Sequence, residues 1–241
     1  MRFAIVSDIH GNLEAFLEVM EDMKHLAVEE VVSLGDNIGY GPDPEEVLHR
    51  LVARGITSIM GNHELGIVDP TFLEWFNTSA RRSLLITTDL LSPWSLEFIR
   101  TLKPAYELHG ALCVHGFPPE SVTTYLFQVN EGELLRHFRS SPFSITFVGH
   151  THELGLIVFD GVRVQHRSLP VGLTTLEADR KYIVNAGSVG QPRDGSNRAK
   201  YLVWDDRSMT LEVRAVAYDI ATTARKILER GFPRINADRL W

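Results

Sequence analysis

The chain has 241 residues, of which 44% are hydrophobic and 23% charged, and its formal net charge is -7. This length fits one large domain that buries roughly 70 to 75% of the surface of the unfolded chain. The negative charge argues against broad binding to duplex nucleic acid, which needs a basic face, and no apolar stretch approaches the ~20 residues that cross a bilayer. With a single cysteine, Cys113, and no visible secretory signal, we expect a cytoplasmic protein without disulfides.

The first part of the chain predicts a βαβ unit and a third strand. Apolar residues recur with helical spacing between two short apolar runs, and Asn12 is a suitable N-cap for that helix. Pro44 suits the first turn of a second helix, after a loop rich in glycine and proline. The predicted elements are strands at 2–7, 30–34 and 56–60 and helices at 12–26 and 44–54.

Residues from about 65 to 103 carry no strand pattern, and we expect them to form a helical cap segment. Its aromatic residues Phe72, Trp75 and Phe76 favour core packing over contact with a ligand. Beyond this segment short strands dominate, and Asp160-Gly161 is a hairpin signal. The predicted elements are strands at 106–109, 111–114, 145–148, 156–159, 162–166, 182–185, 201–204 and 210–217 and helices at 131–139 and 219–230. The βαβ half and the strand-rich half are expected to build two facing sheets with helices outside.

Side chains that can bind metals follow the apolar runs of the predicted strands. The pairs Asp8-x-His10 and His150-x-His152 each follow a run, Asp36 follows Leu34-Gly35, Asn62 and His63 follow Met60-Gly61, and His115 follows Val114. Each pattern alone is more typical of a surface turn or a structural histidine. In an open α/β sheet the ligand crevice lies outside the carboxyl ends of the strands, so their joint placement indicates a site where two metal ions share the Asp36 carboxylate.

Taken in order, these motifs resemble the calcineurin-like metallophosphoesterase family, and most closely its small bacterial and archaeal phosphodiesterase branch. The motifs are Asp8-x-His10, Gly35-Asp36, Gly61-Asn62-His63-Glu64, Val114-His115-Gly116 and Gly149-His150-Thr151-His152. The resemblance runs from residue 3 to about residue 205 and includes the stretch from Asn185 to Arg193. It implies an α/β (α+β) fold, a four-layer α-β-β-α sandwich of two mixed β-sheets flanked by helices, as a single domain over residues 1–241.

The same resemblance implies two divalent metal ions in the loops at the strand ends. It places Asp8, His10 and His152 on one ion and Asn62, His115 and His150 on the other, with Asp36 bridging the two. Only two of these seven ligands are anionic, so the loaded site is net positive and attracts phosphate. Positions left open on each ion are typical of a catalytic rather than a structural site. The mixed ligands leave the choice among manganese, iron, zinc, nickel and cobalt open.

The implied activity is hydrolysis of a small-molecule phosphodiester by direct attack of a metal-bridging hydroxide, without a phosphoenzyme. Phosphomonoesters and dinucleoside polyphosphates stay open as substrates, and the oligomeric state is also open. In the family the position of His63 is the imidazole that contacts phosphate and helps to protonate the leaving oxygen, and Glu64 is expected to orient it. The chain departs from the branch at Glu64, Phe117 and Ala186, where Asp, Ser and Pro are common.

Candidate substrate contacts are Asn62, His63, Tyr40 and Arg193, whose guanidinium offers a fork for phosphate oxygens. Tyr125 is placed in a loop as Tyr40 is, and Phe117 lies beside His115, where its side chain would alter the shape of the cleft. For the turn that carries Arg193, a purely structural role has equal weight. The alternative function is a catalytically silent scaffold of the same fold for protein–protein interaction, and the presence of His63 and all seven ligands argues against it. The remaining histidines are expected to be surface or half-buried residues: His25, His49, His109, His137 and His166.

Overall fold

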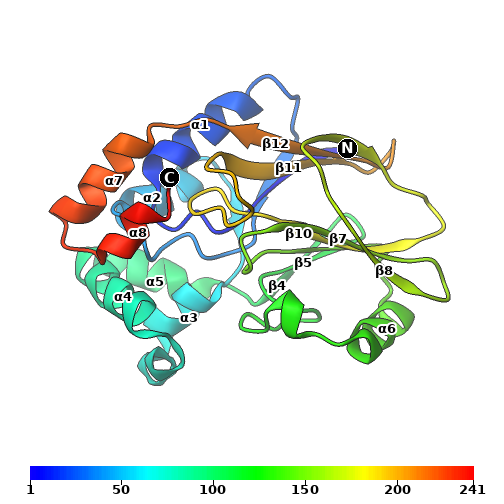
Figure 1. Ribbon diagram of the computed structural model, residues 1–241, viewed down its shortest axis with the longest axis horizontal. Coiled ribbons are helices and arrows are strands. Elements are labelled where there is room, and N and C mark those ends of the chain that lie inside the picture. Colours follow the sequence, from blue (N-terminus) through cyan, green and yellow to red (C-terminus); the bar gives the residue numbers. More distant parts are fainter.

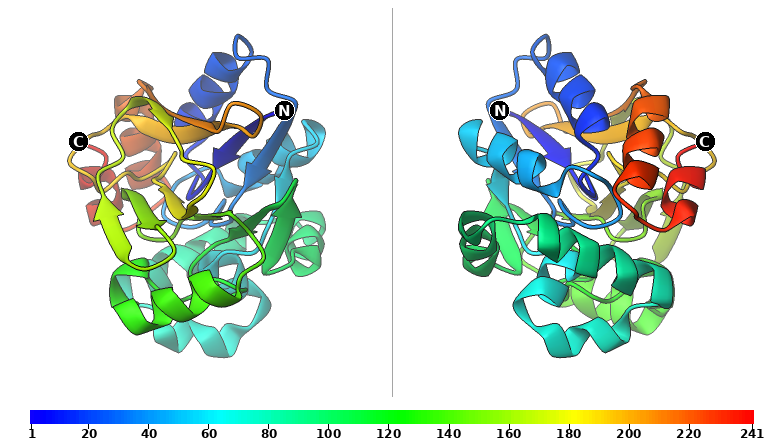
Figure 2. Two further views of the ribbon diagram at one scale, coloured as in Figure 1. Left: turned by 90° about the vertical axis from the view of Figure 1, so that its right-hand side faces the viewer. Right: turned by 90° about the vertical axis from the view of Figure 1, so that its left-hand side faces the viewer.

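Two six-stranded mixed sheets lie face to face between outer helices in the computed structural model, which describes residues 1–241 (Figure 1). Figure 2 shows the layers from the side, with the blue helix α1 (Leu13–Met23) outside one sheet and the green helix α6 (Glu131–Ser140) outside the other. This arrangement confirms the predicted sandwich of two mixed sheets flanked by helices. No helix combines the length and apolar character that crossing a bilayer requires.

The first sheet has the order β3-β2-β1-β11-β12-β9. Its strands are β1 (Arg2–Val6), β2 (Glu30–Ser33), β3 (Thr57–Ser58), β9 (Gly172–Thr175), β11 (Ala199–Asp205) and β12 (Thr210–Val216). The first three run parallel, which confirms the predicted βαβ unit, and β1 pairs antiparallel with β11 on its other side. The helices α1 and α2 (Pro44–Ala53) cover this sheet, with Asn12 as the N-cap of α1 and Pro44 in the first turn of α2.

The second sheet has the order β4-β5-β6-β10-β7-β8, in which β5, β6 and β10 are parallel. Its strands are β4 (Ala105–Leu108), β5 (Ala111–Val114), β6 (Ile145–Val148), β7 (Leu154–Phe159), β8 (Val164–Arg167) and β10 (Lys181–Ala186). The strands β7 and β8 form the predicted hairpin around Asp160-Gly161. The other helical elements are α3 (Asn62–Val68), η1 (Pro70–Trp75), α4 (Thr78–Leu90), α5 (Pro93–Thr101), η2 (Leu126–Gln128), α7 (Ile220–Glu229) and α8 (Arg234–Asp238).

The main core lies between the sheets, because alternate residues of each strand face opposite sides. In β1, Phe3 and Ile5 belong to the core between the sheets, whereas Ala4 and Val6 belong to the cluster under α1 and α2. The Phe147 ring of β6 lies 5.5 Å from the ring of Trp204 on β11, measured between centroids, so this contact joins the two sheets.

One expectation about the fold is wrong in detail, and two elements were not predicted. The halves of the chain do not build separate sheets, because the late strands β11, β12 and β9 complete the sheet that β1 begins. Pairing on both sides of β1 satisfies the backbone groups that an edge strand would leave open. The strand β9 and the helix α8 were not predicted from the sequence: Gly172-Leu173-Thr174-Thr175 has no buried face, and α8 has only five residues.

Substitution of Phe147 by alanine tests the packing between the sheets. Its side chain has no exposed surface, so the cavity left by Phe147→Ala should lower the free energy of unfolding by about 3 to 5 kcal/mol, measured in urea. The matched control is Leu173→Ala, since Leu173 is 68% exposed and should change stability by less than about 0.5 kcal/mol. Equal, small effects of both substitutions would contradict a tightly packed interface at Phe147.

Candidate metal centre

All seven predicted metal ligands come together at the carboxyl ends of the parallel strands, where the two sheets meet. Each follows a strand or begins a helix: Asp8 and His10 after β1, Asp36 after β2, Asn62 at the start of α3, His115 after β5, and His150 and His152 after β6. None of these side chains is more than 3% exposed. The sheet topology therefore collects in one buried place residues that are up to 144 positions apart, from Asp8 to His152.

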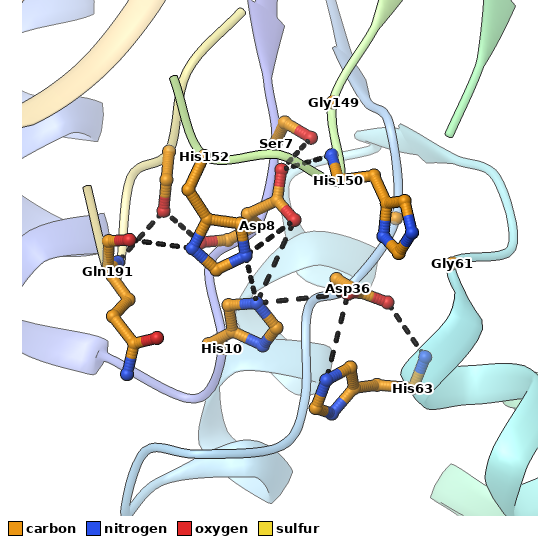
Figure 3. Close-up of polar contacts among 12 residues, drawn as sticks. Ser7, Asp8, His10, Asp36, Gly61, His63, Gly149, His150, His152 and Gln191 are labelled. Carbon is orange, nitrogen blue, oxygen red and sulfur yellow. Dashed lines mark hydrogen bonds and ion pairs between the residues drawn. The ribbon is translucent and has the colours of Figure 1, made fainter. Parts of the chain in front are cut away.

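One group of possible ligand atoms consists of Asp8, His10 and His152 (Figure 3). The Nε2 atoms of His10 and His152 are 3.1 Å apart, and Nε2 of His152 is 3.2 Å from Oδ1 of Asp8. The Asp8 Oδ1 atom is buried and has no hydrogen-bond partner. Asp36 Oδ2 lies 3.8 Å from Nε2 of His10, which joins this group to the next one.

The second group contains Asp36, His115 and His150. Nε2 of His115 lies 3.3 Å from Oδ2 of Asp36 and 3.0 Å from Oδ1 of Asn62. The same carboxylate therefore faces both groups, as expected for a bridging residue. A third group, which contains His10, Asp36 and His63, overlaps both of these groups.

Backbone carbonyl groups fix the orientation of the four histidine rings. A carbonyl only accepts hydrogen bonds, so the ring nitrogen facing it carries the proton and the other nitrogen presents a lone pair. These bonds join Nδ1 of His10 to Ile38 (2.9 Å), Nδ1 of His115 to Leu34 (2.8 Å), Nδ1 of His152 to Gln191 (2.6 Å) and Nε2 of His150 to Thr123 (3.2 Å). His150 thus offers Nδ1 to the centre, whereas the other three offer Nε2.

The chemistry of these atoms fits a cation. With Nδ1 of His10 and His152 donating outward, two lone pairs face each other at 3.1 Å beside an unpaired carboxylate oxygen. Such an arrangement of acceptors is unfavourable in a buried place unless a proton or a metal lies among them. Burial alone lowers the pKa of His115, but the Asp36 carboxylate outweighs it and raises that pKa to about 9. Burial instead lowers the pKa of His10 well below its usual range and the pKa of His150 to about 3, so these two rings are neutral near pH 7 and keep a lone pair for a cation.

The backbone at the site adopts a conformation that the sequence does not reveal. Five of the seven ligand residues have φ between +49° and +68°, in the left-handed region: Asp8, His10, Asp36, His150 and His152. This region is uncommon for residues other than glycine, although Asp, Asn and His tolerate it better than most. It turns each side chain sharply away from the strand direction and toward the centre.

Glycines on either side of Asp36 allow the loops to approach closely. Gly35 has φ of +92°, and a Cβ there would lie 2.5 Å from the backbone nitrogen of Gly61. A Cβ on Gly61 would in turn collide with Oδ1 of Asp36. Because a residue without a Cβ adopts this left-handed backbone without strain and fits against the neighbouring loop, Gly35 lets the Asp36 carboxylate face the centre.

His63 is not one of the seven expected ligands, but its imidazole belongs to the group of possible ligand atoms that also contains His10 and Asp36. Its backbone N–H donates to Oδ1 of Asp36 (2.8 Å), and its Nε2 is 3.9 Å from Oδ2 of the same residue. The ring packs edge-on against the rings of His10 and Tyr40, and Nδ1 is buried without a hydrogen-bond partner. Burial lowers the pKa of His63 to about 4, so the imidazole is neutral near pH 7.

Glu64 does not orient His63, contrary to expectation. Its carboxylate accepts hydrogen bonds from the backbone N–H groups of Asp36 (2.9 Å), Asn37 (2.7 Å) and Gly61 (3.0 Å), and also from the Asn37 side chain (3.2 Å). Burial, followed by the nearby charge of Asp36, raises the pKa of Glu64 to about 7. Because both oxygens are used on the loops, Glu64 is a positioning residue for Asp36 and for the start of α3.

The expected substrate-contacting residues lie at different depths. Tyr40 is 9% exposed and packs against the His10 ring, and the guanidinium carbon of the exposed Arg193 is 6.0 Å from the centroid of the Tyr40 ring. Tyr125 stacks on the His150 ring, with 3.8 Å between centroids. Phe117 instead packs with the cluster under α6, where its ring lies 5.8 Å from that of His137.

Cys113 and the remaining histidines lie where the sequence predicts, whereas one aromatic residue of the helical segment does not. Cys113 is buried in the core, and burial raises the pKa of its thiol. Of the five remaining histidines, His137 is half-buried and the other four are exposed. The aromatic residues of the helical segment divide: Phe76 is buried, whereas Trp75 is 44% exposed, which the expectation of core packing did not anticipate.

Together, the fold and the two carboxylate–histidine groups define a metallophosphoesterase-type protein. Residues 1–208 match the calcineurin-like phosphoesterase superfamily domain, and the chain belongs to this family. It is 32% identical over 244 residues to an uncharacterized protein of Methanocaldococcus jannaschii, covering 99% of this chain and 96% of that protein.

Two solved structures show the similarity in three dimensions. A metallophosphoesterase from Sphaerobacter thermophilus is 32% identical, with a TM-score of 0.84, and the match covers 100% of this chain and 98% of the other. A hypothetical protein from Pyrococcus horikoshii OT3 is 18% identical, with a TM-score of 0.78 and coverage of 100% and 97%. The first places the chain with the metallophosphoesterases, and the second supports the fold.

Alanine substitutions at Asp36 and His63 should separate metal binding from other roles. Asp36→Ala removes the oxygens that face both ligand groups and should abolish metal retention, whereas His63→Ala leaves all seven expected ligands in place. Elemental analysis of purified protein after dialysis measures the difference. Equal loss of metal from both variants would contradict this division of roles.

Substitution of Glu64 by glutamine tests the support of the Asp36 loop. In the wild-type protein, backbone N–H groups donate to both carboxylate oxygens of Glu64. In Glu64→Gln an amide NH₂ group replaces one of these oxygens and faces donors without accepting from them, so the variant should bind metal about 10- to 100-fold more weakly. Competition with a chelator measures the affinity, and Glu107→Gln is the matched control at an exposed carboxylate of β4. Affinity equal to that of the control would show that the loop does not depend on Glu64.

Proposed function

We propose that this protein hydrolyses phosphate esters with the help of two divalent metal ions, and that phosphodiesters are its main substrates. Phosphomonoesters and dinucleoside polyphosphates are the other substrate classes to be compared. The observation that carries the proposal is the set of buried histidine and carboxylate groups around Asp36, whose Oδ2 faces both His10 and His115. Membership of the phosphoesterase family supports it.

In this proposal the seven residues named above are the metal ligands, and Asp36 serves both ions. Manganese, iron, zinc, nickel and cobalt all suit these oxygen and nitrogen donors. When bound, two divalent ions supply Lewis-acid activation of a water molecule and of the phosphoryl group. The proposed reaction is direct displacement at phosphorus by water, without a phosphoenzyme: the bond from phosphorus to the leaving oxygen breaks, and that oxygen takes up a proton. Two divalent ions would bring more positive charge than the carboxylates of Asp8 and Asp36 neutralise, which would leave a net positive site for an anionic ester.

His63 is the proposed catalytic residue: its imidazole contacts the phosphate and donates a proton to the leaving oxygen. Its ring is held by packing against Tyr40 and His10 and by its backbone bond to Asp36. The depressed pKa of His63 follows from burial, and an anionic phosphate beside the ring favours its protonated form. The protonated His63 ring can then donate its proton to the leaving group without a movement of the backbone.

Three other groups are proposed to contact the substrate. Asn62 presents its amide next to His115, Tyr40 lines the centre, and Arg193 lies over the Tyr40 ring at the surface. The Arg193 side chain donates to Oε1 of Gln191 (3.0 Å), whose backbone carbonyl holds His152. The same turn therefore orients a ligand and presents a guanidinium to solvent, which combines the structural and the phosphate-binding roles.

The proposal also includes the domain organisation, the cellular location and the kind of partner. A single domain over residues 1–241, with residues from about 65 to 103 as a helical cap beside the centre, is supported by the helices α3, α4 and α5 in this segment. A cytoplasmic location is supported by the single cysteine, which is buried. The partner is a small phosphate ester rather than duplex nucleic acid, in keeping with the charge of -7.

A panel of esters tests the activity. Metal-loaded protein should hydrolyse bis-p-nitrophenyl phosphate faster than p-nitrophenyl phosphate or diadenosine tetraphosphate, and His63→Ala should lower kcat about 10²- to 10⁴-fold with full metal content. His166→Ala is the matched control, because His166 is exposed on β8. Failure of fully loaded protein on the whole panel would overturn the proposal and favour a catalytically silent scaffold.

A further inference from the structure

A row of nearly parallel aromatic rings extends outward from the metal centre. Trp75 ends η1, and Tyr125 and Phe127 lie at η2, so three rings from two separate segments form a surface that we call the aromatic shelf. The ring of Tyr125 is tilted by 14° from that of Trp75, at 6.0 Å, and by 18° from that of Phe127, at 5.0 Å between centroids.

The aromatic shelf begins on a proposed metal ligand. The Tyr125 ring stacks on the imidazole of His150 at 3.8 Å and 18°, and the Trp75 ring lies 6.3 Å from the same imidazole at 24°. The carbonyl that orients this imidazole belongs to Thr123, two residues before Tyr125. One short segment therefore positions a ligand and supplies the first ring of the shelf.

Two rings of the aromatic shelf are open to solvent. Trp75 is 44% exposed and Phe127 is 75% exposed, whereas most large apolar side chains of the protein are buried. Neither ring fills the core, and Trp75 is held in place by packing on Phe72 at 5.2 Å and Phe76 at 5.3 Å. Rings that are fixed, parallel and exposed provide flat faces on which another aromatic ring can stack.

We propose that the aromatic shelf binds an aromatic group of the substrate, so that the preferred substrates are nucleoside or aryl phosphate esters rather than alkyl esters or inorganic polyphosphate. The inference rests on the proposed function, since it assigns a substrate class to the same site. The exposed rings Trp75 and Phe127 would stack on the base, and Tyr125 joins them to His150, the proposed ligand nearest to a phosphate held at the centre. Stacking of a base on aromatic side chains is favourable and tolerates different bases.

A binding experiment tests the shelf without requiring turnover. Adenosine 5′-monophosphate and ribose 5-phosphate carry the same phosphate and sugar, and only the first has a base. With metal-loaded protein, calorimetry should give a Kd about tenfold or more lower for the adenosine compound. Trp75→Leu and Phe127→Ala should each reduce this ratio severalfold while leaving the affinity for ribose 5-phosphate unchanged.

The matched control is Trp94→Leu. Trp94 is 42% exposed, similar to Trp75, but lies on α5 and stacks on His49 of α2 at 4.4 Å, and it should leave the ratio unchanged. Equal affinity of the wild-type protein for both compounds, or a ratio unaffected by Trp75→Leu, would overturn the inference.

Parallel assays of turnover keep the two proposals apart. If esters are hydrolysed but the base gives no advantage, the shelf is wrong and the phosphoesterase proposal stands. If no ester is hydrolysed but the base advantage depends on Trp75, the shelf stands and the proposed activity fails.

Discussion

The Asp36 carboxylate lies between two sets of acceptor atoms, and much of the surrounding structure follows from holding it there. Its backbone N–H is bound by Glu64, its Oδ1 accepts from the backbone of His63, and its Oδ2 faces the rings of His10 and His115. A buried carboxylate without compensating donors or cations is strongly unfavourable. The Asp36 carboxylate is therefore surrounded by partners of fixed orientation. The loops approach it closely, and backbone carbonyls hold the histidine rings that face it.

The loops that carry the ligands behave as an extension of the sheets. Beyond the last residues of β1 and β2, the loops stay paired through bonds from Asp8 N to Gly35 O (3.1 Å) and from His10 N to Asp36 O (2.9 Å). On the other side of the β1 loop, Gly190 N donates to Asp8 O (2.9 Å). The N–H of His150, from the second sheet, donates to Oδ2 of Asp8 (3.0 Å). Core packing between the sheets, as at Phe147 and Trp204, therefore also sets the spacing between the ligand groups, so fold stability and site geometry depend on each other.

The sequence predicted residue types and strand ends well, because both are local. Runs such as Phe3 to Val6 end in ligand pairs, and that pattern is visible without any tertiary information. Which sheet each late strand joins depends on long-range pairing, as between Phe3 and Trp204, and was assigned incorrectly. The left-handed backbone of the ligands and the true partners of Glu64 were not predictable for the same reason: neighbouring loops impose them. Trp75 illustrates the limit of burial statistics, which describe a residue type and not its place beside a site.

The C-terminal helices α7 and α8 contact the loop that carries Tyr40, and they lie outside the part of the chain that matches the family. The family match ends at residue 208, before α7 and α8, whereas the match to the Sphaerobacter thermophilus structure covers 100% of this chain. Asn236 of α8 donates to the backbone carbonyl of Tyr40 (3.0 Å), and Lys226 of α7 pairs with Asp43 (2.8 Å) in the same loop. Tyr40 has φ of +57°, a conformation that needs such external support. Tyr40 packs on both His10 and His63. By holding the backbone of Tyr40, the C-terminal helices therefore also help to position the proposed catalytic imidazole of His63.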